Sequence, residues 1–203
     1  MKCELLHCTP LEFVAHGVRM SHDNHDKSDT TDSNTIGKKD YGLIKRVGFK
    51  MKHESVLEPM QFIWDLEMST KTLLALSRHR VGVSLTMRST RYTTSKNKGR
   101  HSVQDTDRTK PYLDSIMKIV DEAIAEGLPD DELSLLLPQA YIYRGQITMN
   151  GRSFKHFLDL RLAKGAHFQI RQLAEDMLKS LPEEYREFFE KSPDKDSEKG
   201  DGI

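Results

Sequence analysis

The densest group of cationic side chains in the sequence lies between Arg78 and Lys110. Nine lysines and arginines stand there against two aspartates, a local excess of seven positive charges. Arginine offers a planar fork of donors that matches phosphate oxygens. Hydroxyl side chains interleaved with the cations add further donors of the kind that surround a phosphate: Ser84, Thr86, Ser89 and Thr90. The stretch therefore predicts a site for an anionic ligand, with a solvated basic loop as the alternative.

Arg78-His79-Arg80 is the part of this stretch that is hardest to explain as plain surface. It ends an apolar helical pattern, and its cationic groups repel each other unless an anion or an aromatic ring lies among them. A second unusual run comes later, where Arg152 and His156 are four residues apart and share a helix face. Arg161 can reach the same cleft from the next turn. Together with the Arg78–Arg91 cluster, this triple predicts an anion pocket; a salt-bridged helix surface is the alternative.

Other chemistries find little support in the sequence. His53 stands near two carboxylates, and His22 and His25 near aspartates, but neither group has a third or fourth ligand at a metal-site spacing. No glycine-rich phosphate loop, nucleophile elbow or HExxH motif occurs. Ser89 has no base at triad spacing, so ligand binding is its expected role. We expect no metal site.

The elements that must position these residues can be read from hydrophobic periodicity. Period-two alternation predicts a half-buried strand over Gln61 to Met68, and Ser69 or Thr70 can cap a helix that runs to the Arg-His-Arg triplet. Further elements are a helix around residues 113–124, a short helix Asp130–Leu137, a strand Tyr141–Met149 and two helices after Asn150-Gly151. These elements predict an α/β or α+β fold with a central sheet flanked by helices.

Composition describes a globular chain with polar segments. The 203 residues are 36% hydrophobic and 31% charged, and 31 basic residues balance 31 acidic ones. We expect one domain over residues 1–190, a solvated polar loop over 21–40 and a disordered tail over 191–203. Two cysteines, no apolar run of about 18–20 residues and no signal-peptide pattern favour a cytoplasmic protein without a membrane partner. The balanced net charge gives no indication of a nucleic-acid partner.

Four ordered motifs and the opening segment resemble the flavin-dependent thymidylate synthase family. The motifs are His53-Glu-Ser-Val-Leu-Glu58, Leu76-Ser-Arg-His-Arg80, Ser89-Thr-Arg-Tyr92 and Asn150-x-Arg152-x-x-x-His156-Phe-x-x-x-Arg161. The opening segment runs from Cys3 to Ser21, and the likeness extends from about residue 3 to 190. The resemblance implies a central sheet with surrounding helices, assembled as a homotetramer with sites between subunits. It also implies conversion of dUMP to dTMP with FAD, methylenetetrahydrofolate as carbon donor and NADPH as reductant.

The resemblance also implies roles for individual residues. Arg161 would polarise the uracil ring and favour its ionised form. Residues implied to contact the flavin are Ser21, His53, Ser55, Glu58, Arg78, His79 and Arg80, with Asn150, Arg152 and His156 reaching it from a neighbouring chain. Residues implied to hold dUMP are Arg88, Ser89, Thr90 and Arg91, together with Arg161. Neither cysteine stands in the Pro-Cys-His context of the thymidylate synthases that use a cysteine nucleophile.

Several positions depart from the family pattern, mostly around the nucleotide. Eight residues instead of seven separate the Arg-His-Arg triplet from Ser89, and Thr86-Met87 replaces an Asn-Glu pair. Other departures are Ala75, Ser134 and Gly165-Ala166. We hypothesise that Arg88, the extra residue in this loop, replaces the missing phosphate contact at position 134. A flavin enzyme acting on another pyrimidine nucleotide such as UMP or dCMP, a nucleic-acid-binding module and an inactive relative remain alternatives.

Overall fold

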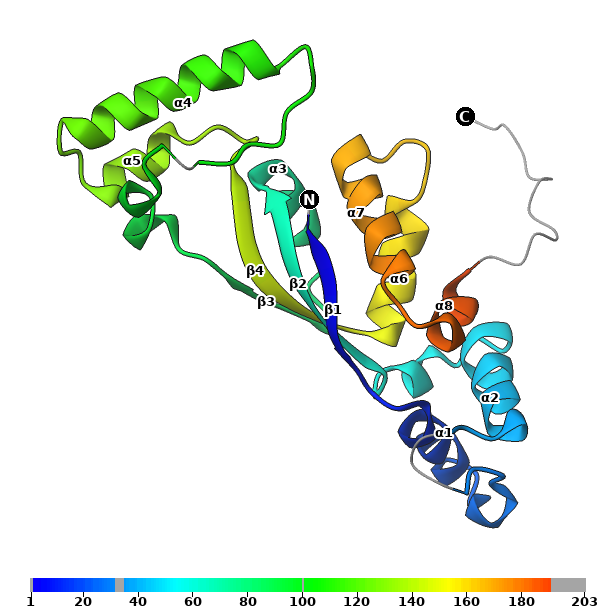
Figure 1. Cartoon of the computed structure of the whole chain (residues 1–203). Coiled ribbons are helices and arrows are strands. Elements are labelled where there is room, and N and C mark those ends of the chain that lie inside the picture. Colours follow the sequence, from blue (N-terminus) through cyan, green and yellow to red (C-terminus); the bar gives the residue numbers. More distant parts are fainter. Residues whose placement is uncertain (1, 32–34, 100, 191–203) are drawn as a thin grey trace.

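The computed structural model describes residues 2–31, 35–99 and 101–190, and a four-stranded antiparallel sheet forms its centre (Figure 1). The strands lie in the order β1 (Cys3–Cys8), β2 (Gln61–Ser69), β4 (Ile142–Asn150), β3 (Val83–Met87). The two long strands pair over their whole length, from Gln61 opposite Asn150 to Ser69 opposite Ile142. Every pair is antiparallel, which confirms the α+β class; a parallel α/β sheet is not what these strands form.

The face of β2 that carries Phe62, Trp64, Leu66 and Met68 is fully buried, as the alternation predicts. Helices α6 (Gly151–Arg161) and α7 (Phe168–Lys179) lie along this side of the sheet (Figure 1). The shorter helices α3 (Thr70–Leu76) and α8 (Glu183–Phe189) join them. The other side of β2, which carries alternating polar residues, stays partly exposed, as is common for antiparallel sheets.

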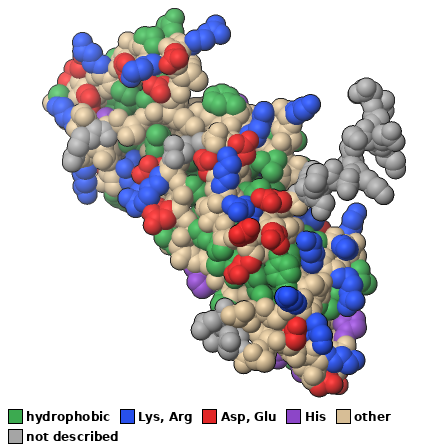
Figure 2. Space-filling view, turned by 45° about the vertical axis from the view of Figure 1, so that its right-hand side comes forward, with side chains coloured by type: hydrophobic (Ala, Val, Ile, Leu, Met, Phe, Trp, Pro, Cys, Tyr) green, Lys and Arg blue, Asp and Glu red, His purple; other side chains and the backbone are tan. Residues whose placement is uncertain are grey.

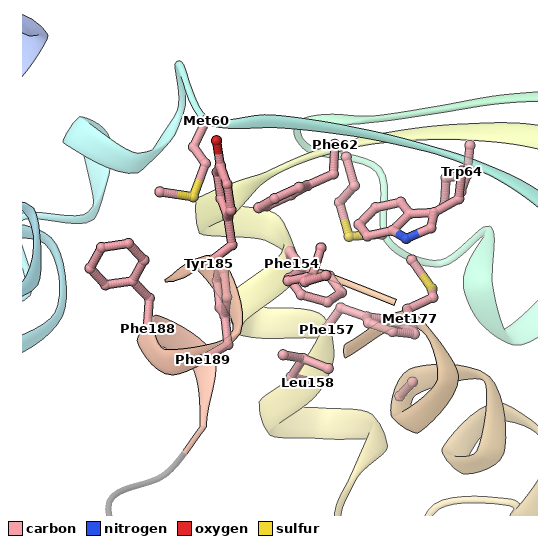
Figure 3. Packing of buried hydrophobic residues seen from close by; sticks show 14 of the residues in the cluster. Met60, Phe62, Trp64, Phe154, Phe157, Leu158, Met177, Tyr185, Phe188 and Phe189 are labelled. Atoms are coloured by element: carbon pink, nitrogen blue, oxygen red, sulfur yellow. The ribbon is translucent and has the colours of Figure 1, made fainter. Parts of the chain in front are cut away.

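An aromatic cluster fills the space between the sheet and these helices (Figure 3). The ring of Phe154 on α6 lies 5.2 Å from Trp64 and 5.0 Å from Phe189 of α8, measured between centroids. The indole Nε1 of Trp64 donates a hydrogen bond of 2.9 Å to Ser180 Oγ, so the largest buried side chain has its polar atom satisfied. This packing holds α6 firmly against the sheet.

A second, smaller cluster lies at the other end of the sheet, under α4 (Lys110–Ala125) and beside α5 (Asp130–Leu136). Met117 and Val120 of α4 pack there against Tyr141, which is 1% exposed. In Figure 1 this helical arm projects beyond the strands. Both helices were expected from the sequence: α5 ends one residue earlier than expected, and α4 extends the expected 113–124 by three residues at its start and one at its end.

The segment between residues 21 and 40 departs from one expectation at a buried residue. After α1 (Leu11–Met20), the described residues include the short turn η1 (His25–Lys27) and the start of α2 (Lys38–Ile44). Asp40 is 1% exposed, forms an ion pair with Arg19 and accepts hydrogen bonds from Ser28 and Thr30. Most described residues of this segment are exposed or half-buried, as a solvated loop would be, but Asp40 is an exception because Arg19 supplies a partner that local composition does not reveal. The predicted tail 191–203 lies outside the described residues.

The remaining turns connect α2 to the sheet. A π-helical stretch, η2 (Lys45–Lys50), and the turn η3 (Glu54–Leu57) lead into β2. Strands β1 and β3 and helices α1, α2 and α8 were not expected from the sequence. None of the helices in the described part of the chain is long and apolar enough to cross a membrane.

Candidate active site

A hollow of about 720 Å³ lies between the end of α3 and the outer side of α6. Arg78, His79 and Arg80 line it from one side. Arg152, His156 and Arg161 of α6 line it from the other. The structure thus brings together, within one chain, the two groups that the sequence indicates as parts of an anion pocket. That α6 residues reach a flavin from a neighbouring chain stays a prediction.

Local structure fixes how the two groups face each other. Helix α3 begins at Ser69, whose Oγ accepts from the backbone N–H of Thr72 at 3.2 Å, so the expected cap is confirmed. Helix α6 begins at Asn150, whose Oδ1 accepts from the N–H of Ser153 at 2.8 Å. Ser153 Oγ in turn donates to the carbonyl of Val81 at 2.6 Å. This last bond ties the Arg-His-Arg turn directly to α6.

Gly82 makes the turn between Arg80 and β3 possible. Its φ of +64° lies in the left-handed region, where a side chain is strained. A Cβ at this position would lie 2.2 Å from Asn150 Nδ2 and 2.6 Å from Ser153 Oγ. Only glycine therefore lets the turn approach the start of α6 this closely.

Arg161 is held in place by a neutral histidine. Its Nε donates to His79 Nε2 at 3.1 Å, and its Nη2 donates to the carbonyl of Ala75 at 3.1 Å. Burial, together with the positive charges of Arg161, His156 and Arg78, lowers the pKa of His79 to about 4. At neutral pH the imidazole is therefore uncharged and can accept this hydrogen bond, which orients the guanidinium of Arg161.

The hollow keeps a surplus of positive charge. Four arginines and one carboxylate, Glu54, line it. Glu54 already forms an ion pair of 2.9 Å with Lys155, while Arg152 pairs with Glu58 at 2.8 Å. Among the residues that the structure describes, no hydrogen bond or ion pair engages the side chains of Arg78 or Arg80. Cations left unpaired around a cavity favour an anionic ligand.

A second hollow of about 530 Å³ adjoins the first and shares Glu54 and Arg152 with it. Ser21, His53 and Ser55, all indicated as flavin contacts by the family motifs, line this hollow. Asn150 lines neither hollow: it is 7% exposed and serves as the cap of α6. Its contact with a cofactor stays a prediction. Within the described parts of the chain, no group of three or more side chains could hold a metal ion.

Of the residues indicated for the nucleotide, Arg161 lines the first hollow and the other four lie elsewhere. Arg88, Ser89, Thr90 and Arg91 follow the far end of β3, a five-residue strand that spans about 17 Å. Arg88 Nη2 donates to Tyr141 Oη at 3.3 Å and to the carbonyl of Ile142 at 3.2 Å, and Arg91 pairs with Asp131. The expectation that the whole Arg78–Arg91 cluster lines one pocket with α6 is therefore wrong within one chain, because the strand β3 separates its two halves.

Some lining residues were missed by the sequence analysis. Glu54 and Ser153 each stand beside a residue that the motifs single out, and Leu160 precedes Arg161, so adjacency was the available signal. No sequence signal indicated Tyr141, because the hydrogen bond between its hydroxyl and Arg88 joins residues that are 53 positions apart.

Comparisons with known proteins identify the family. The model of the family described as thymidylate synthase complementing protein matches residues 4–185. The flavin-dependent thymidylate synthase of Wolinella succinogenes is 32% identical, over 93% of this chain and 97% of that protein. The enzyme of Campylobacter jejuni strain RM1221 is also 32% identical, over 98% of this chain and 100% of its own length.

Solved structures agree with the sequence relatives. The crystal structure of the flavin-dependent thymidylate synthase of Helicobacter pylori, complexed with FAD and dUMP, superposes with a TM-score of 0.85 at 26% identity. The match covers 94% of this chain and 98% of that one. The arginine-lined hollow, the ordered motifs and these matches agree, and the chain belongs to the flavin-dependent thymidylate synthases, a family of methyltransferases.

Proposed function

We propose that the chain converts dUMP to dTMP with FAD as redox cofactor, methylenetetrahydrofolate as carbon donor and NADPH as reductant. The observation that carries this proposal is the pair of joined hollows, in the first of which Arg78 and Arg80 have no partner among the described residues. The Helicobacter pylori relative, which has a similar fold, is a complex with FAD and dUMP. Cys3 and Cys8 are free thiols, which are typical of a reducing compartment, so we expect the protein in the cytoplasm and without a membrane partner.

The residues present fit an anionic dinucleotide such as FAD. Arg78, Arg80 and Arg152 supply the charge that a diphosphate needs, and His79 and His156 offer ring faces beside them. Ser21, His53 and Ser55 extend the donor set into the second hollow, and Glu58 orients Arg152. The chemistry that a bound flavin supplies is hydride transfer and carriage of a one-carbon unit, which no side chain provides.

Arg161 is the residue proposed to act on the uracil ring. Carbon 5 of uracil is a poor nucleophile, and a fixed cation against the ring oxygens stabilises the negative charge that develops during reaction. The hydrogen bonds to His79 and Ala75 hold Arg161 ready for that role. No cysteine competes for it, because Cys3 and Cys8 lie in β1, and burial raises the pKa of the Cys3 thiol to about 11.

We further propose that a complete site forms between chains. The nucleotide loop, residues 88–91, lies a strand length away from the arginine-lined hollow, so one chain does not join the two. A homotetramer, in which the loop of one chain approaches the hollow of another, would bring dUMP beside the flavin. Sedimentation of the purified protein, with and without FAD, tests this assembly.

A second candidate is the same chemistry on UMP or dCMP. The side chain of Met87 packs against Gly145, where an added Cβ would lie 2.4 Å from the Met87 sulfur. The hydroxyl of Ser134 donates a hydrogen bond to the carbonyl of Asp131. These positions therefore offer the nucleotide none of the contacts that the family pattern has there. A nucleic-acid surface is disfavoured, since acidic and basic side chains are interspersed on the face in Figure 2.

The decisive experiment follows the flavin absorbance of the purified protein. A yellow protein whose flavin bands shift when dUMP is added, and that releases tritium from carbon 5 of labelled dUMP, supports the proposal. A yellow protein that responds to UMP or dCMP but not to dUMP supports the second candidate. A colourless protein that takes up no added FAD contradicts both.

Arg78→Ala should weaken FAD binding about tenfold, as expected for one lost charge-assisted contact. Arg186→Ala, on the remote helix α8, should leave FAD binding unchanged.

A further inference from the structure

Behind the nucleotide loop lies a chain of four polar side chains, of which the proposed reaction uses only Arg88. Asp121 of α4 lies 3.3 Å from His101, between Oδ1 and Nε2. His101 Nδ1 lies 3.4 Å from Tyr141 Oη, and that hydroxyl accepts from Arg88 Nη2 at 3.3 Å. The guanidinium of Arg88 also lies over the Tyr141 ring, 5.8 Å from its centroid.

This chain is buried and only partly satisfied. The His101 side chain is 2% exposed and Tyr141 is 1% exposed. Within the described residues, Arg88 Nε is buried without a hydrogen-bond partner, and His101 Nε2 has only the Asp121 carboxylate beside it, at 3.3 Å. Unsatisfied buried donors cost stability, and an apolar cluster would fill the same space without that cost. The arrangement therefore calls for an explanation other than stability.

Each member of the chain is attached to a rigid element. Asp121 also accepts from the backbone N–H of Gly99 at 3.0 Å, and Tyr141 packs among Met117 and Val120. Arg88 continues the pairing of β3 with β4, since its N–H donates to the carbonyl of Arg144 at 2.9 Å. Its guanidinium thus joins the first residue of the nucleotide loop to Ile142 of β4 and to Tyr141, which packs under the α4 arm.

We propose that Tyr141 and His101 are positioning residues that hold Arg88 and thereby set the loop Ser89–Arg91 for the phosphate of the nucleotide. The inference rests on the proposed function, because holding Arg88 in place affects activity only if this loop binds the nucleotide. Ser89 follows Arg88 directly, so rotation of the Arg88 side chain out of its anchor frees the start of the loop. Loss of the tyrosine hydroxyl leaves Arg88 Nη2 with the carbonyl of Ile142 alone.

Tyr141→Phe tests the proposal, with Tyr143→Phe as the matched control. Tyr143 lies two residues along, with its ring 5.7 Å from that of Tyr141, and its hydroxyl has no hydrogen bond among the described residues. The dissociation constants of dUMP and of deoxyuridine, which lacks the phosphate, are measured on FAD-loaded protein from the flavin absorbance change. Tyr141→Phe should weaken dUMP about tenfold, the value of one hydrogen bond to a charged group, and leave deoxyuridine unchanged.

The comparison of the two ligands separates positioning from general destabilisation. A merely structural role would weaken both ligands alike or lower the FAD content, and either result would overturn the proposal. His101→Gln, which should act in the same direction with a smaller effect, gives a second test if Tyr141→Phe does not fold. Equal dUMP affinity in wild type and both variants overturns this inference alone. A FAD-loaded wild type that binds no pyrimidine nucleotide overturns the proposed function and, with it, this inference.

Discussion

The two arginine-rich regions at opposite ends of β3 differ in what their cations contact. At the Val83 end, Arg78 and Arg80 face a hollow without a partner in the described chain. At the Met87 end, Arg88 is bound to Tyr141 and Arg91 to Asp131. The arginines of the first region can therefore bind an anion directly. Those of the second region must first release Tyr141 or Asp131, or bind the anion in addition to them.

Replacing the Asp131 carboxylate by a phosphate at Arg91 costs little free energy. The side chains of Arg91 and Asp131 are 63% and 62% exposed, and ion pairs this exposed contribute little to stability. A doubly charged phosphate can therefore displace the Asp131 carboxylate. The difference between the regions shows that arginines close together in a sequence can have different surroundings in the fold: Arg78 and Arg80 have no partner among the described residues, whereas Arg88 and Arg91 already have one.

Arg161→Ala should have the largest effect on the first region. Removal of one fixed donor for developing charge lowers turnover by about 100-fold to 1,000-fold. FAD content should stay near that of wild type, because Arg78, Arg80 and Arg152 remain. Single-turnover dTMP formation gives the measurement. Turnover that falls only as far as it does in Arg186→Ala would contradict the role of Arg161.

Gly82→Ala should disturb the junction between the two regions. The new Cβ would overlap Asn150 Nδ2 in a left-handed turn, so the free energy of unfolding should fall by about 1–3 kcal/mol. FAD affinity should fall with it, since the Arg-His-Arg turn precedes this glycine. Denaturant unfolding checks the stability. Gly17→Ala, in α1 with open space around its Cβ, is the control and should be neutral or stabilising.

The pH dependence of stability should reveal the neutral state of His79. Its pKa of about 4 in the folded chain lies below the ordinary value of 6.5. As the pH falls, this histidine therefore becomes protonated in the unfolded chain at a higher pH than in the folded chain. The stabilising contribution is complete above about pH 6.5 and is lost as the pH falls towards about 4. Thermal midpoints should therefore fall less steeply over this window in His79→Gln than in wild type. Parallel curves would show that His79 is not held neutral by burial.

Asp131→Asn should have the smallest effect and acts only on the second region. It removes an exposed partner of Arg91, so stability should change little. The affinity for dUMP should rise by about twofold to fivefold, because the phosphate no longer competes with a carboxylate. Isothermal titration of the FAD-loaded protein measures this change. Weaker dUMP binding would show that Asp131 supports the loop rather than competing with the ligand.

Much of the fold and half of the site could be predicted from the sequence. Strand β2 and helix α4 were predictable because their apolar residues follow one period over eight or more positions. Strand β3 was missed, since Val83, Leu85 and Met87 stand among charged and hydroxyl residues. Strand β1 was missed because a register shift between Leu5 and His7 breaks its alternation.

The site was predictable only where motif and helix geometry agree. Arg152 and His156 share a face of α6 by their spacing, and that face does line the hollow. Long-range contacts gave no local sign: Arg161 meets His79 across 82 residues, and Arg19 meets Asp40 across 21. Such pairs depend on how elements pack together, which periodicity within each element does not determine.

The burial of the two native thiols decides how the protein can be labelled. Cys3 has a pKa of about 11, and the pKa of Cys8 is also raised by burial. Because only the thiolate reacts with alkylating reagents, about one Cys3 side chain in a thousand is reactive at pH 8. A cysteine introduced at Leu135, which is 83% exposed on α5, would therefore take up a fluorophore selectively. Energy transfer from that dye to added FAD would then test whether the α5 arm of one chain lies near the hollow of another, as the proposed tetramer requires.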